Sequence, residues 1–232
     1  YGLAIRGYWE TPNSDDAFIE SQLDIRDAKG RAMPGYGWIF PLGDGEINVG
    51  AGMISTFKGW KDANTTATLD AYVESLPDYW KITDETVHTK PLGGKLPMSL
   101  SVGPKVGRNW MLIGDASGAV NPFNGEGIDY AYETGRMAAA HGADFIAGRE
   151  SALASYAQEL EDVYGDYHRV ARVFAKAIGR PAVIRTLTTV GLRNRPLMEW
   201  TLKVMANLLD PEEAKMTEHV YRAIERTVNI GS

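Results

Sequence analysis

The chain has 232 residues, 44% of them hydrophobic and 23% charged, a composition typical of a globular protein of one or two domains. The formal net charge of -6, with no block of like charges, argues against nucleic acid as a partner. The absence of cysteine excludes disulfides, thiol chemistry and cysteine-based zinc sites, and the four histidines show no metal-ligand spacing, so no metal site is expected.

Residues 1–98 are predicted to consist mainly of strands and turns. The segment 36–54 contains two apolar runs separated by Asp44-Gly45, a dipeptide that favours a tight hairpin turn. Apolar residues alternate along both runs, and we expect the alternating set to form one apolar face. That set is Trp38, Phe40, Ile47 and Val49.

The segment 66–80 has apolar residues at helical spacing, and Pro77 ends the pattern. The spaced residues are Leu69, Tyr72, Val73 and Leu76. We therefore predict a short helix that covers the sheet.

The apolar run 110–113 follows the Gly- and Pro-rich segment 91–97 and is predicted to form one buried strand. From about residue 125 the pattern is helical almost to the end of the chain. Glycine and proline interrupt it at Gly148, Gly179-Arg180-Pro181, Gly191, Arg195-Pro196 and Asp210-Pro211.

The N-terminus has neither an initiator methionine nor a basic-then-apolar signal pattern, and no apolar run is long enough to span a bilayer. We expect a soluble chain that begins within a longer protein.

A glycine-rich junction lies between the predicted strand and the first long helix. A strand that ends in Gly114-Asp115 and a helix that opens at 125–127 would present unpaired backbone N–H groups and a positive helix end to a ligand. Glycine lets a flat ligand lie on the backbone, and Asp115 is placed to accept hydrogen bonds from sugar-like hydroxyls. The alternative is an ordinary helix N-terminus, with glycine for turn geometry and aspartate as a local cap.

This junction resembles the second flavin-contacting motif of FAD-dependent enzymes with the p-hydroxybenzoate hydroxylase fold. The matching residues are Gly114, Asp115, Ala116, Ser117, Gly118, Pro122, Gly125, Glu126, Gly127, Ile128, Ala131 and Gly135. The resemblance implies that Asp115 contacts the ribityl and diphosphate part of FAD and that 125–128 line the isoalloxazine ring. In the aromatic hydroxylases of this fold a histidine often stands where this chain has Ser117-Gly118, and that departure points away from them.

A second motif, 34-PGYGWIFP-41 followed by Asn48-Val49-Gly50, resembles the Y-x-W-x-F-P signature of the geranylgeranyl reductase family. In that family the signature lines the cavity for a prenyl chain, which implies that Tyr36, Trp38, Phe40 and Pro41 bind substrate. An alternating aromatic set also suits an apolar tail on physical grounds, although Trp38 and Phe40 could simply be sheet core. The segment 91–110 is similar to the family in its actinobacterial form, whose members reduce the tail of menaquinone or of geranylgeranyl lipids.

The G-x-G-x-x-G turn that holds the adenosine diphosphate half of FAD in this family is absent from the sequence. We therefore expect an α+β chain that is the C-terminal part of an α/β FAD-binding fold, without its N-terminal Rossmann portion. The resemblance implies a substrate-binding antiparallel sheet domain at 1–98, the last strand and helix of the FAD domain at 99–148, and a helical region at 149–232. Alone, such a fragment is expected to be inactive.

The implied reaction is the transfer of a hydride from reduced FAD to an isolated double bond of a prenyl lipid or isoprenoid quinone, followed by protonation. The sequence identifies neither the catalytic proton donor nor the electron donor. Tyr36 has a suitable hydroxyl, but a tyrosine in a cavity wall is more often a packing or hydrogen-bonding residue. Glu126 in the first helical turn is as readily explained by the helix dipole, and Arg6 could face the flavin or pair with a carboxylate.

The segment 181–209 combines apolar residues with Arg185, Arg193, Arg195 and Lys203 and contains one acid, Glu199. Such helices can lie on an anionic membrane or pack over a catalytic domain. We expect a cytoplasmic location, with peripheral contact to the inner face of the plasma membrane as the alternative. A flavin monooxygenase or halogenase of the same fold and a non-enzymatic prenyl-lipid-binding module remain alternative functions.

Overall fold

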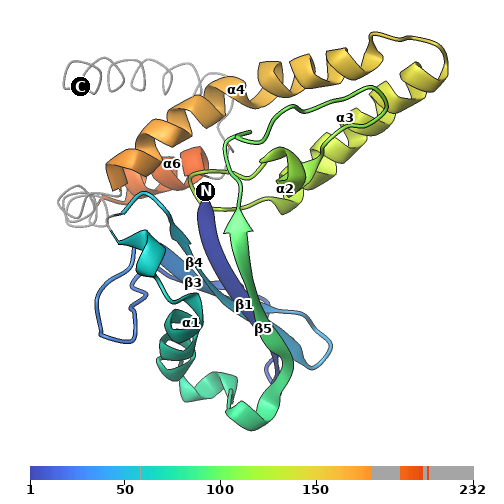
Figure 1. Cartoon of the computed structure of the whole chain (residues 1–232). Helices are drawn as coiled ribbons and strands as arrows, with labels where there is room; N and C mark the ends of the chain where they lie inside the picture. Colours follow the sequence, from blue (N-terminus) through green and yellow to red (C-terminus); the bar gives the residue numbers. More distant parts are fainter. Residues whose placement is uncertain (58, 179–193, 206–207, 209–232) are drawn as a thin grey trace. The chain divides into compact units, whose positions relative to one another are not determined.

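The computed structural model describes residues 1–57, 59–178, 194–205 and 208 (Figure 1). The chain divides into two compact units, Tyr1–Leu96 and Pro97–Ser232. The first is a sheet covered by a helix, and the described part of the second is mainly helical.

The first unit is built on a five-stranded sheet in which every pairing is antiparallel. Its strands are β1 (Gly2–Glu10), β2 (Glu20–Gln22), β3 (Gly35–Pro41), β4 (Glu46–Ile54) and β5 (Val87–Leu96). Their order is β2-β3-β4-β1-β5, so β2 and β5 form the two edges, and the β1–β5 pairing shifts register twice around Tyr8.

One face of this sheet is covered by α1 (Thr65–Glu74), which confirms the helix predicted before Pro77 (Figure 1). Asn64 caps the helix, since its side-chain oxygen accepts a hydrogen bond of 3.1 Å from the Ala67 N–H. Leu69 and Tyr72 from α1 are buried in the core of this unit. The sheet contributes Ile5, Trp9, Ile39, Ile47, Val49 and Ala51 to the same core.

The predicted hairpin of β3 and β4 is confirmed, but the prediction that its alternating apolar residues share one face is wrong. Trp38 pairs with Gly50 and Phe40 with Asn48, whereas Ile47 and Val49 pair with Pro41 and Ile39. The four-residue connection sets a register in which residues of equal parity lie on the same face, so the even-numbered aromatic residues oppose the odd-numbered aliphatic ones. The aliphatic set lies under α1, and the aromatic set lies on the open face.

The second unit contains α2 (Gly114–Ser117), α3 (Ile128–Ile146), α4 (Ala152–Ile178) and α6 (Arg195–Met205). Helices α3 and α4 run side by side as a hairpin (Figure 1). The chain turns at Gly148, whose φ of +96° favours glycine, as the helix break predicted there requires. Their shared core contains Tyr130, Ala138, Tyr156, Leu160 and Tyr164.

The prediction of a buried strand at 110–113 is wrong. Met111 makes only an isolated bridge to Val106, and the side chains of Trp110 and Ile113 are each 43% exposed. Two backbone hydrogen bonds join this segment to 105–107, from the Gly107 N–H to the Trp110 carbonyl and from the Leu112 N–H to the Lys105 carbonyl. The described residues provide no longer strand for it to pair with, so the apolar run alone does not make a strand. The predicted helix breaks at 179–181, 191 and 210–211 lie outside the described residues, and Arg195-Pro196 begins α6.

Candidate functional site

The glycine-rich junction forms a tight loop that leads into α3. Gly114, Gly118 and Gly125 have φ values of +50°, +75° and +76°, a backbone conformation that residues with a side chain rarely adopt. At Gly114 the loop also passes very close to α3, because an added Cβ would come within 2.9 Å of the Ala131 Cβ. Glycine is therefore required here both for backbone conformation and for close approach.

The start of the loop is fixed to α3 by Thr134, whose side chain is fully buried. Its hydroxyl oxygen accepts a hydrogen bond of 2.9 Å from the Gly114 N–H and donates one of 2.7 Å to the Tyr130 carbonyl. Sequence reasoning did not single out Thr134, because only the fold brings it next to Gly114, 20 residues earlier in the chain.

Lys105 ties the preceding segment to the same loop. Its ammonium group donates hydrogen bonds to the carbonyl oxygens of Leu100 at 2.7 Å and Ser117 at 2.6 Å, and to that of Val102. Burial lowers the pKa of Lys105. Gly118 fits beneath this segment, since an added Cβ would lie 2.8 Å from the Ser101 nitrogen. The segment 98–106 and the glycine loop thus form one structure.

Asp115 lies in the short helix α2 with its side chain exposed. An added Cβ at Gly127 would come within 2.8 Å of the Asp115 Oδ1, so glycine at this position makes room for the carboxylate. Exposed Ile128 follows immediately, at 77% exposure. The loop thus offers an accessible hydrogen-bond acceptor beside a surface with few side chains, which suits a flat ligand that carries hydroxyl groups.

The start of α3 is capped by Glu126. Its carboxylate accepts a hydrogen bond of 2.9 Å from the Asp129 N–H and is also hydrogen-bonded to the Ile128 backbone. Burial raises the pKa of Glu126, although these two hydrogen bonds oppose the shift. The geometry fits the capping explanation of this residue.

The expectation of unpaired N–H groups at Gly125 and Glu126 is wrong. The Gly125 N–H donates to the Asn121 carbonyl at 2.8 Å, and the Glu126 N–H donates to the Asn124 side chain at 2.9 Å. The main-chain carbonyl of Asn121 and the side chain of Asn124 satisfy these groups by closing local turns, and the second contact is one that asparagine side chains often make. Pro122 is buried beside Asn121 and contributes to the loop's structure.

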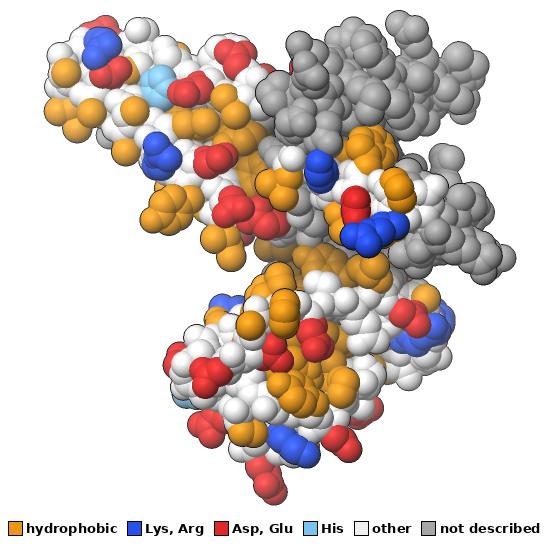
Figure 2. All heavy atoms as spheres, turned by 180° about the vertical axis from the view of Figure 1, so that it is seen from behind, with side chains coloured by type: hydrophobic (Ala, Val, Ile, Leu, Met, Phe, Trp, Pro, Cys, Tyr) orange, Lys and Arg blue, Asp and Glu red, His pale blue; other side chains and the backbone are white. Residues whose placement is uncertain are grey.

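In the sheet unit, the open face carries the predicted substrate-binding aromatic residues in a row. The ring centroids of Tyr36 and Trp38 are 5.8 Å apart, and those of Trp38 and Phe40 are 6.0 Å apart with nearly parallel planes. All three side chains are half-buried, and Figure 2 shows hydrophobic side chains gathered on this unit. Pro41 lies on the other face, because strand alternation turns it toward Ile47.

Trp38 is held in place from two directions. Its indole Nε1 donates a hydrogen bond of 2.8 Å to the Asn48 side chain. The ring covers Gly50, where an added Cβ would lie 2.1 Å from the Trp38 Cζ2. The pairing of Trp38 with Asn48 and Gly50 explains why the sequence combines the aromatic motif with Asn48-Val49-Gly50.

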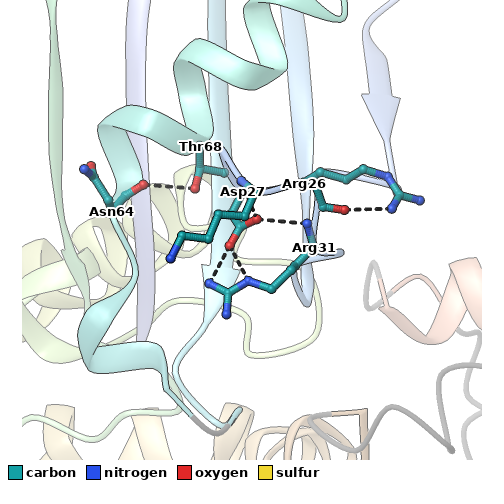
Figure 3. Close-up of polar contacts among 7 residues, drawn as sticks. Arg26, Asp27, Arg31, Asn64 and Thr68 are labelled. Atoms are coloured by element: carbon teal, nitrogen blue, oxygen red, sulfur yellow. Dashed lines mark hydrogen bonds and ion pairs between the residues drawn. The ribbon is translucent and has the colours of Figure 1, made fainter.

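The sheet unit has two hollows away from the aromatic row, and none of the predicted site residues lines them. One, of about 500 Å³, lies between α1 and the loop before β3. That loop is organised by Asp27, whose carboxylate accepts hydrogen bonds from the Arg31 guanidinium and from the N–H groups of Lys29 and Arg31 (Figure 3). The hydrogen bonds with Arg31, above all that of its side chain, lower the pKa of Asp27. The other, of about 530 Å³, is bordered by Leu3, Trp60, Lys61 and Lys95.

Among the described residues no cluster of histidine and acidic side chains could hold a metal ion. The described helices include none that is both long and apolar enough to cross a bilayer.

No family model matches the chain. It is 39% identical over 222 residues to a menaquinone reductase of Mycobacterium tuberculosis, a match that covers 96% of this chain and 53% of the relative. Identity to the menaquinone reductase of Mycolicibacterium smegmatis is 38% over the same shares. A digeranylgeranylglycerophospholipid reductase of Methanocella arvoryzae is 35% identical over 66% of this chain and 36% of its own length. The chain thus spans about half the length of the menaquinone reductases that it matches.

Solved structures of low sequence identity share the fold. A geranylgeranyl bacteriochlorophyll reductase-like protein from Thermoplasma acidophilum aligns with a TM-score of 0.62 at 20% identity, covering 94% of this chain and 54% of that one. A flavoprotein/dehydrogenase from Cytophaga hutchinsonii gives 0.60 at 14% identity, over 99% and 55% of the two chains. The flavin-dependent brominase Bmp2 gives 0.57 at 15%, over 100% and 56%. The predicted fold class is confirmed.

Proposed function

Because the chain belongs to the geranylgeranyl reductase family of FAD-dependent oxidoreductases, we propose that it forms part of an enzyme that reduces double bonds in isoprenoid chains. The observation that carries the proposal is 39% identity to a menaquinone reductase over 96% of the chain. The substrate class is a prenyl lipid or isoprenoid quinone, such as menaquinone or a geranylgeranyl lipid.

The residues of the glycine loop fit FAD. The accessible Asp115 carboxylate would accept hydrogen bonds from the ribityl hydroxyls, and 125–128 would lie along the ring system. The space that glycine leaves at Gly127 supports this role, because a side chain there would collide with Asp115. Bound FAD would supply the hydride that saturates a double bond.

The aromatic row supplies the binding surface for the chain. Tyr36, Trp38 and Phe40 form a half-buried surface on which an isoprenoid segment can bury its methyl groups. Asn48 and Gly50 hold the indole in one orientation, and a fixed wall limits the positions that the chain can adopt. An unactivated double bond gains reactivity chiefly through such alignment, so orientation is the main contribution of these residues.

An exposed apolar surface runs along α3. Ile128, Tyr132 and Ile146 are 77%, 76% and 86% exposed, and Ile113 before α2 is 43% exposed. Hydrophobic side chains protrude from the helical arm of α3 and α4 in Figure 2. Since the matched reductases are about twice as long as the aligned region, we propose that protein outside this chain covers this surface in the working enzyme.

A prenyl-lipid substrate resides in the bilayer, so the enzyme would work at a membrane surface, on the cytoplasmic side. The basic segment proposed for this contact, 181–209, lies mostly outside the described residues. Sedimentation with anionic vesicles that depends on salt would support the contact, and its absence would oppose it.

The test uses protein expressed at the length of its relatives and loaded with flavin. A prenyl quinone or a geranylgeranyl lipid is incubated with this protein and a chemical reductant, and the lipid is then analysed by mass spectrometry. We expect two hydrogens to be gained for each saturated bond. In a parallel incubation that also contains dioxygen and halide, gain of oxygen or halogen would instead favour a monooxygenase or halogenase. Binding without chemical change would favour a lipid-binding module.

An Asp115→Ala variant distinguishes an effect on flavin binding from an effect on folding. We expect loss of flavin absorbance, with an unfolding temperature equal to that of the unchanged protein stripped of flavin, because the exposed side chain makes little contribution to the fold. Full flavin content in this variant would contradict the assigned role. Glu150→Ala, which removes an exposed carboxylate just before α4, provides the control and should retain flavin.

A further inference from the structure

Arg6 lies on β1, and its guanidinium stacks over the aromatic ring of Tyr8. Its Cζ is 4.7 Å from the centroid of the Tyr8 ring. Among the ion pairs of the described residues, none joins Arg6 to a carboxylate. Arg6 as a residue is half-buried, and within the described part of the chain its guanidinium has no carboxylate partner, which leaves its N–H donors available to a ligand acceptor.

Strand pairing puts Arg6 next to the aromatic row. Arg6 pairs with Gly50, and Gly50 pairs with Trp38, so the three residues form one cross-strand line on the open face. Neighbouring strands are about 4.8 Å apart, which places the Arg6 and Trp38 Cα atoms about 10 Å from each other. The Trp38 indole extends over Gly50, in the direction of β1, and so narrows the remaining distance.

The acidic side chains of this region lie at the far end of the strands. Glu10 and Glu46 pair across β1 and β4, four residues beyond Arg6, which is about 13 Å along a strand. Both carboxylates are near His88, which forms an ion pair with Glu46. Glu10 and Glu46 therefore lie too far along the strands to form an ion pair with Arg6 in place of a ligand.

The contact with Tyr8 leaves the guanidinium able to bind a ligand. A ring attracts the cation through its π face, whereas the N–H donors of arginine lie in the guanidinium plane and point outward from its edge. The ring restricts the side chain, and the outward N–H groups remain suited to an oxygen acceptor.

We propose that Arg6 binds an oxygen acceptor on the head group of the prenyl substrate, while the aromatic row receives the chain. A quinone carbonyl and a phosphate share this chemistry. The inference rests on the proposed function, because it assigns the head-group end of the same substrate site. Arg6 then determines specificity: it selects isoprenoids that carry an acceptor at one end over plain hydrocarbons.

The experiment compares Arg6→Leu and Arg6→Lys with the unchanged protein, flavin-loaded and at the length of its relatives. Equilibrium binding and initial rates are measured with a prenyl quinone, a prenyl diphosphate and an isoprenoid hydrocarbon without a head group. Loss of one charge-assisted hydrogen bond predicts about 10- to 100-fold weaker binding of a head-bearing substrate in Arg6→Leu, with unchanged binding of the hydrocarbon. Lysine should restore binding of a phosphate better than that of a carbonyl, and the substrate that loses affinity identifies the head group.

Arg26 provides the matched control, because it is an exposed arginine that pairs with Asp24. Arg26→Leu should bind all three ligands like the unchanged protein. Equal weakening for the hydrocarbon in Arg6→Leu, loss of flavin from that variant, or unchanged binding of both head-bearing ligands would each overturn the proposal. If the unchanged protein binds the quinone but saturates no bond, the reductase function fails while weaker binding by Arg6→Leu still supports the head-group role.

Discussion

His168 on α4 is buried without a hydrogen-bond partner for either ring nitrogen among the described residues. Burial, reinforced by the positive charges of Arg172 and Lys105, lowers the pKa of His168 to about 4. Its ring lies against three tyrosines, Tyr130, Tyr164 and Tyr167. The folded protein therefore holds the neutral form of this imidazole.

A folded-state pKa below the usual 6.5 means that the unfolded chain binds the proton more readily. The stabilising contribution of neutral His168 is complete above pH 6.5 and is lost as the pH falls toward about 4. The difference between the two pKa values corresponds to roughly 3 kcal/mol of unfolding free energy. Replacement of His168 by Phe or Leu should remove this part of the acid sensitivity.

The assay is urea unfolding of the unchanged protein, His168→Phe and His168→Leu at about pH 7.5 and about pH 4. Between these conditions the unchanged protein should lose up to roughly 3 kcal/mol more than either variant. Two replacements of different shape separate titration from packing, because a packing defect shifts stability equally at both pH values. Equal acid losses in all three proteins would refute the reasoning.

Gly50→Ala should cost about 1–3 kcal/mol of stability and weaken prenyl-chain binding, because the new methyl group would displace Trp38. Gly52→Ala is the control: its new methyl group would lie 3.4 Å from the nearest atom of Trp38, and it should cost less than about 1 kcal/mol. Thermal unfolding and ligand titration measure both, and equal effects would contradict the assigned contact. Thr134→Val should cost about 1–3 kcal/mol, because it leaves the Gly114 N–H buried without an acceptor, while Thr134→Ser should retain most of the stability. Denaturant unfolding tests this, and a neutral valine variant would show that the hydrogen bond is unimportant.

Elements with local signals could be predicted from the sequence. The β3–β4 hairpin follows from Asp44-Gly45, and α1 follows from helical spacing that ends before Pro77. The face of the aromatic row could not be predicted, because it depends on the register that a four-residue connection imposes. The run 110–113 was wrongly assigned as a strand because a strand also requires a neighbour with which to pair.

The candidate site also has residues that could be predicted from the sequence and residues that could not. The glycines and Asp115 belong to a continuous motif, and Tyr36, Trp38 and Phe40 to another, so both groups were visible in the sequence. Their supports were not. Thr134 and Lys105 act through contacts 20 and 12 residues away along the chain, and no local spacing distinguishes them from other polar residues. The FAD and substrate roles of the two motifs stay predictions until they are measured.

The margins of the sheet resist extension by other polypeptides. At one side β2 has only three residues, and at the other β5 carries Lys90, Pro91 and Lys95 and deviates from regular register near Tyr8. Lysine disfavours an apolar neighbour, proline lacks an N–H to donate, and the irregular register breaks the flat repeat that stacking needs. The unit can thus keep a broad aromatic face available for an apolar ligand without aggregating edge to edge.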